Sequence, residues 1–191
     1  MKQHIVNSRT KLANKRVGVV ILNWNNYTDL VETIEAVYTN QKSYSEIDIL
    51  VVDSGSIDRS TNKVQKKYPN NKYIYLKKNV GFAKGNNAGI KYFLKKNYPY
   101  IFLLNNDISL EKSCIAKLVA ELETNSRCAM VGPRIYSYDN RDKFQLTSGE
   151  LDIWKAKPMS KWAYEKEKLH HPTKRNVNKL PGCALLIKKR L

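Results

Sequence analysis

Three apolar runs separated by helical segments constrain the fold of this chain more than any other feature. The runs span Val17–Leu22, Ile47–Val52 and Tyr100–Leu104, and the second contains one charged residue, Asp48. Continuous β-branched and apolar runs are typical of strands buried on both faces of a parallel sheet. The segments between them show helical periodicity. The sequence therefore predicts an α/β fold with a mainly parallel central sheet flanked by helices.

Polar side chains follow two of these strands. Asp53 comes directly after the second, and Asn105-Asn106-Asp107 comes after the third. Because α/β sheets bind ligands outside the carboxyl ends of their strands, we expect a site at this edge. Asp107 can coordinate Mg²⁺ or Mn²⁺ together with substrate phosphates, and Asp53 can accept an N–H from a pyrimidine base. Both also fit structural roles, Asp107 as a helix N-cap and Asp53 in an Asx turn.

Three glycines mark the start of the helix expected after a short strand over Tyr73–Leu76. Gly81, Gly85 and Gly89 would let phosphate oxygens approach backbone N–H groups and the positive end of the helix dipole. Their spacing differs from the dinucleotide-binding pattern G-x-G-x-x-G, so they are a weak indication when taken alone.

The last third of the chain is less regular. Met130–Ile135 predicts a strand that Gly132-Pro133 weakens at its centre or places at an edge. Gly182–Ile187 predicts a final buried strand. Residues 136–179 lack periodicity, and their length indicates a functional segment. We therefore expect a basic extension over 1–16 and a single domain over 17–191.

The charge balance favours anionic partners. Lys and Arg total 34 against 17 Asp and Glu, for a formal net charge of +17. Nucleotide phosphates, lipid head groups and nucleic acid all fit such an excess, and solvated lysines are the alternative explanation. We expect no nucleic-acid partner, because the basic residues are dispersed along the sequence and no recognised RNA- or DNA-binding block is present.

Cysteine usage and hydropathy indicate a cytoplasmic protein. Cys114, Cys128 and Cys183 are widely spaced and odd in number, which favours reduced core thiols over disulfides or a zinc site. The sequence shows no apolar run of the roughly 20 residues that span a bilayer, and its first residues lack the apolar core of a secretory signal.

Five blocks in a fixed order carry a family resemblance. Together they resemble the family 2 glycosyltransferases with a GT-A fold, and look closest to their rhamnosyltransferase-like branch. The resemblance covers most of residues 17–187 and implies a Rossmann-like nucleotide-sugar-binding fold that is truncated at its C-terminus. The blocks are Val17–Asn25, Val51–Asp58, Asn79–Asn87, Leu103–Asp107 and Pro181–Ile187.

The resemblance also implies roles for single residues. Trp24 would stack on the nucleotide base and Asp53 would bind the base edge. Asn106 would touch the ribose, and Asp107 would hold the metal ion bound to the diphosphate, which we expect to be Mg²⁺ or Mn²⁺. The remaining residues that the resemblance places in the nucleotide-sugar site are Leu22, Gly81, Lys84 and Asn105.

The implied reaction is an inverting transfer from a UDP- or dTDP-sugar to a glycan or lipid-linked saccharide. The basic extension would allow peripheral contact with the anionic inner face of the membrane. In relatives the catalytic base lies beyond the strand matched by Pro181–Ile187, and the sequence stops at Leu191. We therefore assign no catalytic residue, and expect donor binding with poor transfer. A non-catalytic nucleotide-sugar-binding module is the alternative.

Overall fold

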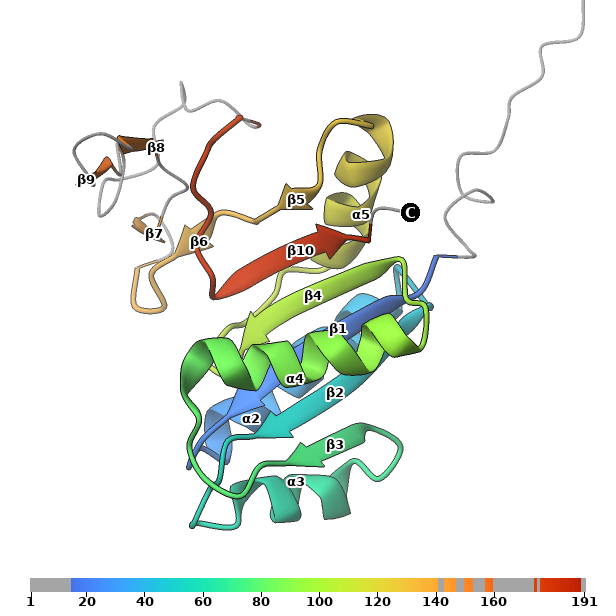
Figure 1. Cartoon of the computed structure of the whole chain (residues 1–191), viewed down its shortest axis with the longest axis vertical. Helices are drawn as coiled ribbons and strands as arrows, with labels where there is room; N and C mark the ends of the chain where they lie inside the picture. Colours follow the sequence, from blue (N-terminus) through green and yellow to red (C-terminus); the bar gives the residue numbers. More distant parts are fainter. Residues whose placement is uncertain are drawn as a thin grey trace, which may run out of the picture.

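A six-stranded sheet with the order β3-β2-β1-β4-β10-β5 forms the centre of the computed structural model (Figure 1). The structure describes residues 15–140, 143–146, 150–152, 157–159, 174 and 176–189. Strands β1 to β4 are parallel, whereas β10 is antiparallel to both β4 and β5. The strands are β1 (Val17–Asn23), β2 (Ile47–Asp53), β3 (Lys72–Tyr75), β4 (Tyr100–Asn105), β5 (Met130–Val131) and β10 (Ala184–Lys188).

Helices cover both faces of this sheet, which confirms the predicted fold class. Side chains of α2, α3 and α5 form one core cluster with the sheet, and α4 forms a second cluster on the opposite face (Figure 1). Successive side chains of β1 point to opposite faces of the sheet, so Val19 and Ile21 belong to the first cluster and Val20 belongs to the second. The helices are α2 (Thr28–Gln41), α3 (Ser60–Lys67), α4 (Gly81–Lys95) and α5 (Cys114–Thr124).

Glycines allow α4 to pack closely on the sheet. A Cβ atom at Gly85 would lie 2.4 Å from Leu22 Cδ1, and one at Gly89 would lie 2.4 Å from Val20 Cγ1. Both positions therefore face the sheet, and the interpretation of these two glycines as a phosphate cradle is wrong. Gly81 differs, because a Cβ there would meet nothing within 4 Å.

The segment expected as a strand over 130–135 is broken. Gly132-Pro133 separates β5 at the sheet edge from β6 (Ile135–Tyr136), which pairs with β7 (Phe144–Leu146) in a separate two-stranded sheet. A further pair consists of β8 (Glu150–Asp152) and β9 (Lys157–Met159). The rest of the 136–179 segment lies largely outside the described residues, as do residues 1–14 of the basic extension. Among the described helices, none is both long and apolar enough to cross a membrane.

The three cysteines are free thiols, as expected, but each is half-buried and none belongs to the fully buried core. Burial raises the pKa of Cys114, at the start of α5, from 9.0 to about 11. The thiol therefore favours the folded state below pH 9, where it is neutral in both states. This contribution is lost as the pH rises from 9 to 11.

We expect the free energy of unfolding to fall between pH 9 and 11 by on the order of 2 kcal/mol through Cys114. Urea unfolding across this range measures the fall. Cys114→Ala removes the titrating group and should show a correspondingly smaller fall. Equal slopes for the parent and the variant would contradict a buried neutral thiol.

Candidate functional site at the carboxyl edge of the sheet

The strand order changes direction between β1 and β4. From β1 the chain adds β2 and β3 on one side, and then crosses to place β4 on the other. In α/β sheets this arrangement opens a crevice at the carboxyl ends of the two strands. The register brings the predicted residues to that edge, because Asn23 lies opposite Asp53 and Leu22 lies opposite Asn105.

A buried amide at the end of β1 orients Asn106. Asn23 is fully buried, and its Nδ2 donates to Ser60 Oγ and Thr61 Oγ1, both at 2.9 Å. Its Oδ1 accepts a hydrogen bond from Asn106 Nδ2 at 2.8 Å. With the amide nitrogen of Asn106 turned inward, its carbonyl oxygen is the atom placed to accept from a ligand hydroxyl. Asn23 was not predicted as a site residue, although a polar residue at the end of a buried strand is a signal for such a role.

The carboxylate of Asp53 is held in a turn after β2. The residue is only 4% exposed, and its Oδ1 accepts the Ser56 N–H at 2.6 Å. Burial raises the pKa of Tyr75, the register partner of Asp53 on β3, and the nearby Asp53 charge raises it further. The predicted Asx turn is therefore present, and it leaves Oδ2 as the second acceptor of a preorganised carboxylate.

The loop before α4 is fastened to the end of β2. Ser54 Oγ accepts the Val80 N–H at 3.2 Å, and Asn79 Oδ1 accepts the Gly81 N–H at 2.9 Å. Gly55 is needed where the two loops touch, since a Cβ there would lie 2.5 Å from the Lys78 carbonyl carbon. Gly81 has a φ of 78°, which favours glycine, and it opens α4 at this edge.

The start of β10 completes the edge beside β4. The Asn105 N–H donates to Cys183 O at 2.8 Å, and Gly182 lies against the ring of Phe82. Burial raises the pKa of the Cys183 thiol, and the negative charge of Asp107 contributes to the rise. Asp107 therefore lies close to the segment that enters β10. Sequence periodicity could not show this contact, because it carries no information on strand direction.

The remaining predicted residues differ in exposure. Trp24 is 55% exposed just after β1, and Asp107 is exposed just after β4. Lys84 is exposed in the first turn of α4. Leu22 is half-buried and packs beneath α4 at Gly85. Phe82, which was not predicted as a site residue, is 50% exposed and lies against Gly182 at the same edge.

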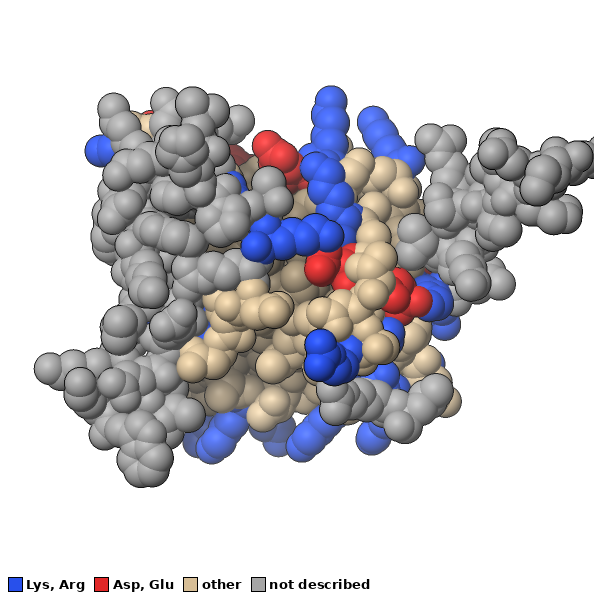
Figure 2. All heavy atoms as spheres, turned by 90° about the horizontal axis from the view of Figure 1, so that it is seen from above, with Lys and Arg blue, Asp and Glu red and all other residues tan. Residues whose placement is uncertain are grey.

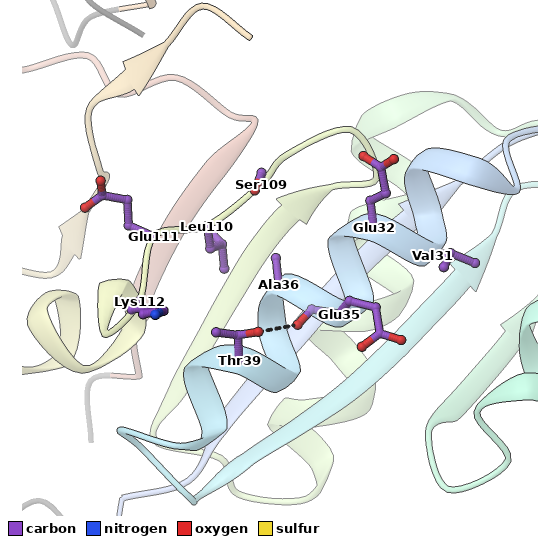
Figure 3. Close-up of a pocket in the computed structure, with 9 residues that line it drawn as sticks. All are labelled: Val31, Glu32, Glu35, Ala36, Thr39, Ser109, Leu110, Glu111 and Lys112. Atoms are coloured by element: carbon purple, nitrogen blue, oxygen red, sulfur yellow. Dashed lines mark hydrogen bonds between the residues drawn. The ribbon is translucent and has the colours of Figure 1, made fainter.

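A hollow elsewhere on the surface does not fit an anionic ligand. It has a volume of about 520 Å³ and lies between α2 and the loop from β4 to α5. Its lining residues include three glutamates, Glu32 and Glu35 on α2 and Glu111 on the loop, and one lysine, Lys112 (Figure 3). The net negative charge of this lining disfavours a diphosphate. The carboxyl edge of the sheet is therefore the better candidate site.

A family model for glycosyl transferase family 2 matches residues 18–190 of the sequence. The chain belongs to this family. The match includes every residue proposed for the site, and it agrees with the α/β architecture described above. No curated protein sequence matches significantly.

Several solved structures share the fold at low sequence identity. S. aureus TarS 1–349 has a TM-score of 0.57 and 18% identity, over 71% of this chain and 41% of that chain. The same protein with UDP-GlcNAc gives a TM-score of 0.59 and 17% identity, over 72% and 38%. Mannosyltransferase PcManGT from Pyrobaculum calidifontis, with GDP-Man and Mn²⁺, gives 0.59 and 14%, over 91% and 44%. This chain thus spans less than half the length of these relatives.

The residues present fit a metal ion only in part. Within the described ranges, no group of three or more His, Cys, Asp and Glu side chains could hold one. Mg²⁺ and Mn²⁺ nevertheless bind through one or two carboxylates when substrate phosphates supply further oxygens. Asp107 offers such a carboxylate, and the Asn106 carbonyl oxygen lies next to it in sequence. The donor set therefore suits a metal ion that arrives with a diphosphate.

Proposed function

We propose that this family 2 glycosyltransferase domain binds a UDP- or dTDP-sugar at the carboxyl edge of the sheet and transfers the sugar, with inversion, to a glycan or lipid-linked saccharide. One observation carries the proposal. The buried Asp53, the oriented Asn106 and the exposed Asp107 lie on the edge where β1 meets its two neighbours. The rhamnosyltransferase-like branch remains our preferred assignment within the family.

Each residue has a role that matches its environment. Asp53 is preorganised to accept an N–H from the base, and the exposed Trp24 can stack on the base plane. The Asn106 carbonyl oxygen accepts a ribose hydroxyl. Gly81 leaves open space for phosphate oxygens at the start of α4, where the helix dipole favours negative charge.

Asp107 would hold Mg²⁺ or Mn²⁺ against the diphosphate of the donor. Such an ion stabilises the negative charge of the departing nucleoside diphosphate. The other proposed contacts are Leu22, which supports α4 beneath the site, Lys84, which can approach the phosphates, and Asn105 beside Asn106.

A non-catalytic nucleotide-sugar-binding module is the second candidate. Transfer requires a base for the acceptor hydroxyl, and we assign no residue to this role. Two further carboxylates near this edge each accept a hydrogen bond, Asp29 from Asn26 Nδ2 at 2.7 Å and Asp58 from the Ser60 N–H at 2.9 Å. Donor binding without transfer would favour this candidate.

We expect UDP or dTDP to raise the unfolding temperature in the presence of Mn²⁺, and to do so much less with a chelator. At about a hundredfold excess over the dissociation constant, the stabilisation is near 2.7 kcal/mol. A thermal-shift series with UDP, dTDP, GDP and their sugars measures the effect. Stabilisation by GDP alone would contradict the pyrimidine assignment, and no shift with any nucleotide would contradict the site.

A further inference from the structure

The charge of this chain is segregated. From Arg59 to Asn106 the sequence contains no Asp or Glu, but it contains eleven Lys and Arg. This stretch comprises α3, β3 and α4, together with the strand β4 that is buried in the sheet. The expectation of dispersed basic residues is therefore wrong for this part of the molecule. The eleven residues are Arg59, Lys63, Lys66, Lys67, Lys72, Lys77, Lys78, Lys84, Lys91, Lys95 and Lys96.

Helix α4 concentrates part of this charge on one outward face. Lys84, Lys91 and Lys95 are exposed and recur at intervals of seven and four residues, so they form one row along the helix. The row is about 16 Å long. Lys96 and the loop lysines Lys77 and Lys78 are exposed at its two ends. We call these six lysines the α4 basic face.

The α4 basic face lies apart from acidic side chains. In Figure 1, α4 covers its side of the sheet alone. Figure 2 views the molecule from above, so the α4 side of the sheet lies along its lower margin. Lys and Arg side chains protrude along this margin, and no Asp or Glu is seen among them. Among the described residues from Arg59 to Asn106, Lys67 is the one basic residue that forms an ion pair. It lies on the opposite side of the sheet from α4, with its Nζ 3.8 Å from Glu35 Oε1. The positive charge of the face is therefore available to an external anion.

We propose that the α4 basic face docks on an anionic lipid bilayer. A row of lysines along a surface helix suits a flat, negatively charged plane, because each cation near such a surface adds to the attraction. One large apolar side chain flanks this row, because Leu94 is 39% exposed and lies three residues after Lys91. Apolar groups beside lysines are typical of helices that rest in the head-group region. This inference does not depend on nucleotide binding.

The orientation that follows is specific. The amino end of α4 lies at the carboxyl edge of the sheet, where Gly81 opens the helix. If the α4 basic face rested on the bilayer, the carboxyl edge of the sheet would stand beside the membrane surface and open parallel to it. A saccharide held by a membrane lipid could then reach the site without leaving the surface.

Vesicle co-sedimentation of the complete 191-residue chain tests the proposal. The probe is vesicles of phosphatidylglycerol and phosphatidylcholine, with phosphatidylcholine vesicles for comparison. The test variant is Lys91→Gln with Lys95→Gln, which retains good helix formers. The matched control is Lys112→Gln with Lys117→Gln, two exposed lysines in the loop before α5 and in its first turn, on the other side of the sheet. Circular dichroism and thermal unfolding verify the fold of each variant.

We expect the parent chain to bind only the anionic vesicles and to dissociate as salt is raised. The test variant should bind about thirtyfold more weakly, from a factor of roughly five per lysine, while the control stays close to the parent. Equal losses in both variants, or no binding by the parent, would overturn the proposal. So would displacement of the vesicles by an oligonucleotide at matched charge, which would assign the face to nucleic acid.

Discussion

Replacing Asp107 with Ala should remove most of the gain in nucleotide affinity that Mg²⁺ or Mn²⁺ provides. Asp107 is the carboxylate that follows β4, and its neighbours Asn105 and Asn106 offer only neutral amide oxygens. Replacing outer-shell partners of metal ligands already costs about 10–100-fold in metal affinity, and the loss of the ligand itself should cost at least as much. Calorimetric titration of UDP or dTDP, with the metal and with a chelator, measures the difference.

Two further variants make this result specific. Asp53→Ala should weaken binding with or without metal and reduce the preference between bases, because Asp53 lies at the end of β2 and is proposed to contact the base. Glu111→Ala removes an exposed carboxylate from the same loop as Asp107 and should leave binding unchanged. If the Asp107 and Asp53 variants both bind like the parent, the site is wrong.

Gly18→Ala should destabilise the fold by about 2 kcal/mol. A Cβ at Gly18 would lie 2.4–2.5 Å from three atoms of the Phe93 ring, which is fully buried on α4. Overpacking a core costs about 1–3 kcal/mol, and the rigid ring places this site at the upper end. Exchanging Gly for Ala also lowers the conformational entropy of the unfolded chain, but this stabilises the folded state by only about 0.4–1 kcal/mol. The overpacking therefore dominates, and the urea midpoint should fall.

Two controls identify the cause of the loss. Gly182→Ala adds a Cβ that would meet Phe82 at an ordinary 3.4 Å, so its stability should equal or slightly exceed that of the parent. Combining Gly18→Ala with Phe93→Leu should cost less than the sum of the two single changes, because contacting residues couple. Strict additivity would contradict the contact between α4 and β1.

Local pattern was sufficient for most of the sheet. The strands expected over 17–22, 47–52 and 100–104 occur at Val17–Asn23, Ile47–Asp53 and Tyr100–Asn105. Apart from Asp48, these runs contain no charged residue, which indicates burial on both faces of the sheet. Asp53 and Asn105 reach the same edge because β1, β2 and β4 are parallel. That part of the candidate site follows from strand type alone.

Other features depend on information that a local pattern lacks. The glycine spacing after Asn79 does not show which glycines face the sheet, and Gly85 and Gly89 prove to be packing positions. The Asn23 network joins residues far apart in sequence, so no short motif shows it. The lack of Asp and Glu from Arg59 to Asn106 is visible in the sequence, but the lysines of α4 are separated by residues that point into the core, so only the helix places them on one face.

The antiparallel direction of β10 determines how many residues must separate this strand from any later acid that reaches the candidate site. The strand enters at the carboxyl edge beside Asn105 and leaves at the opposite edge, where the Lys189 N–H donates to Pro99 O. Its five residues span about 17 Å. A chain that returned this distance as an α-helix would need about eleven residues. A carboxylate acting on the acceptor from that side would thus lie well beyond β10 in sequence, after a second crossing of the sheet.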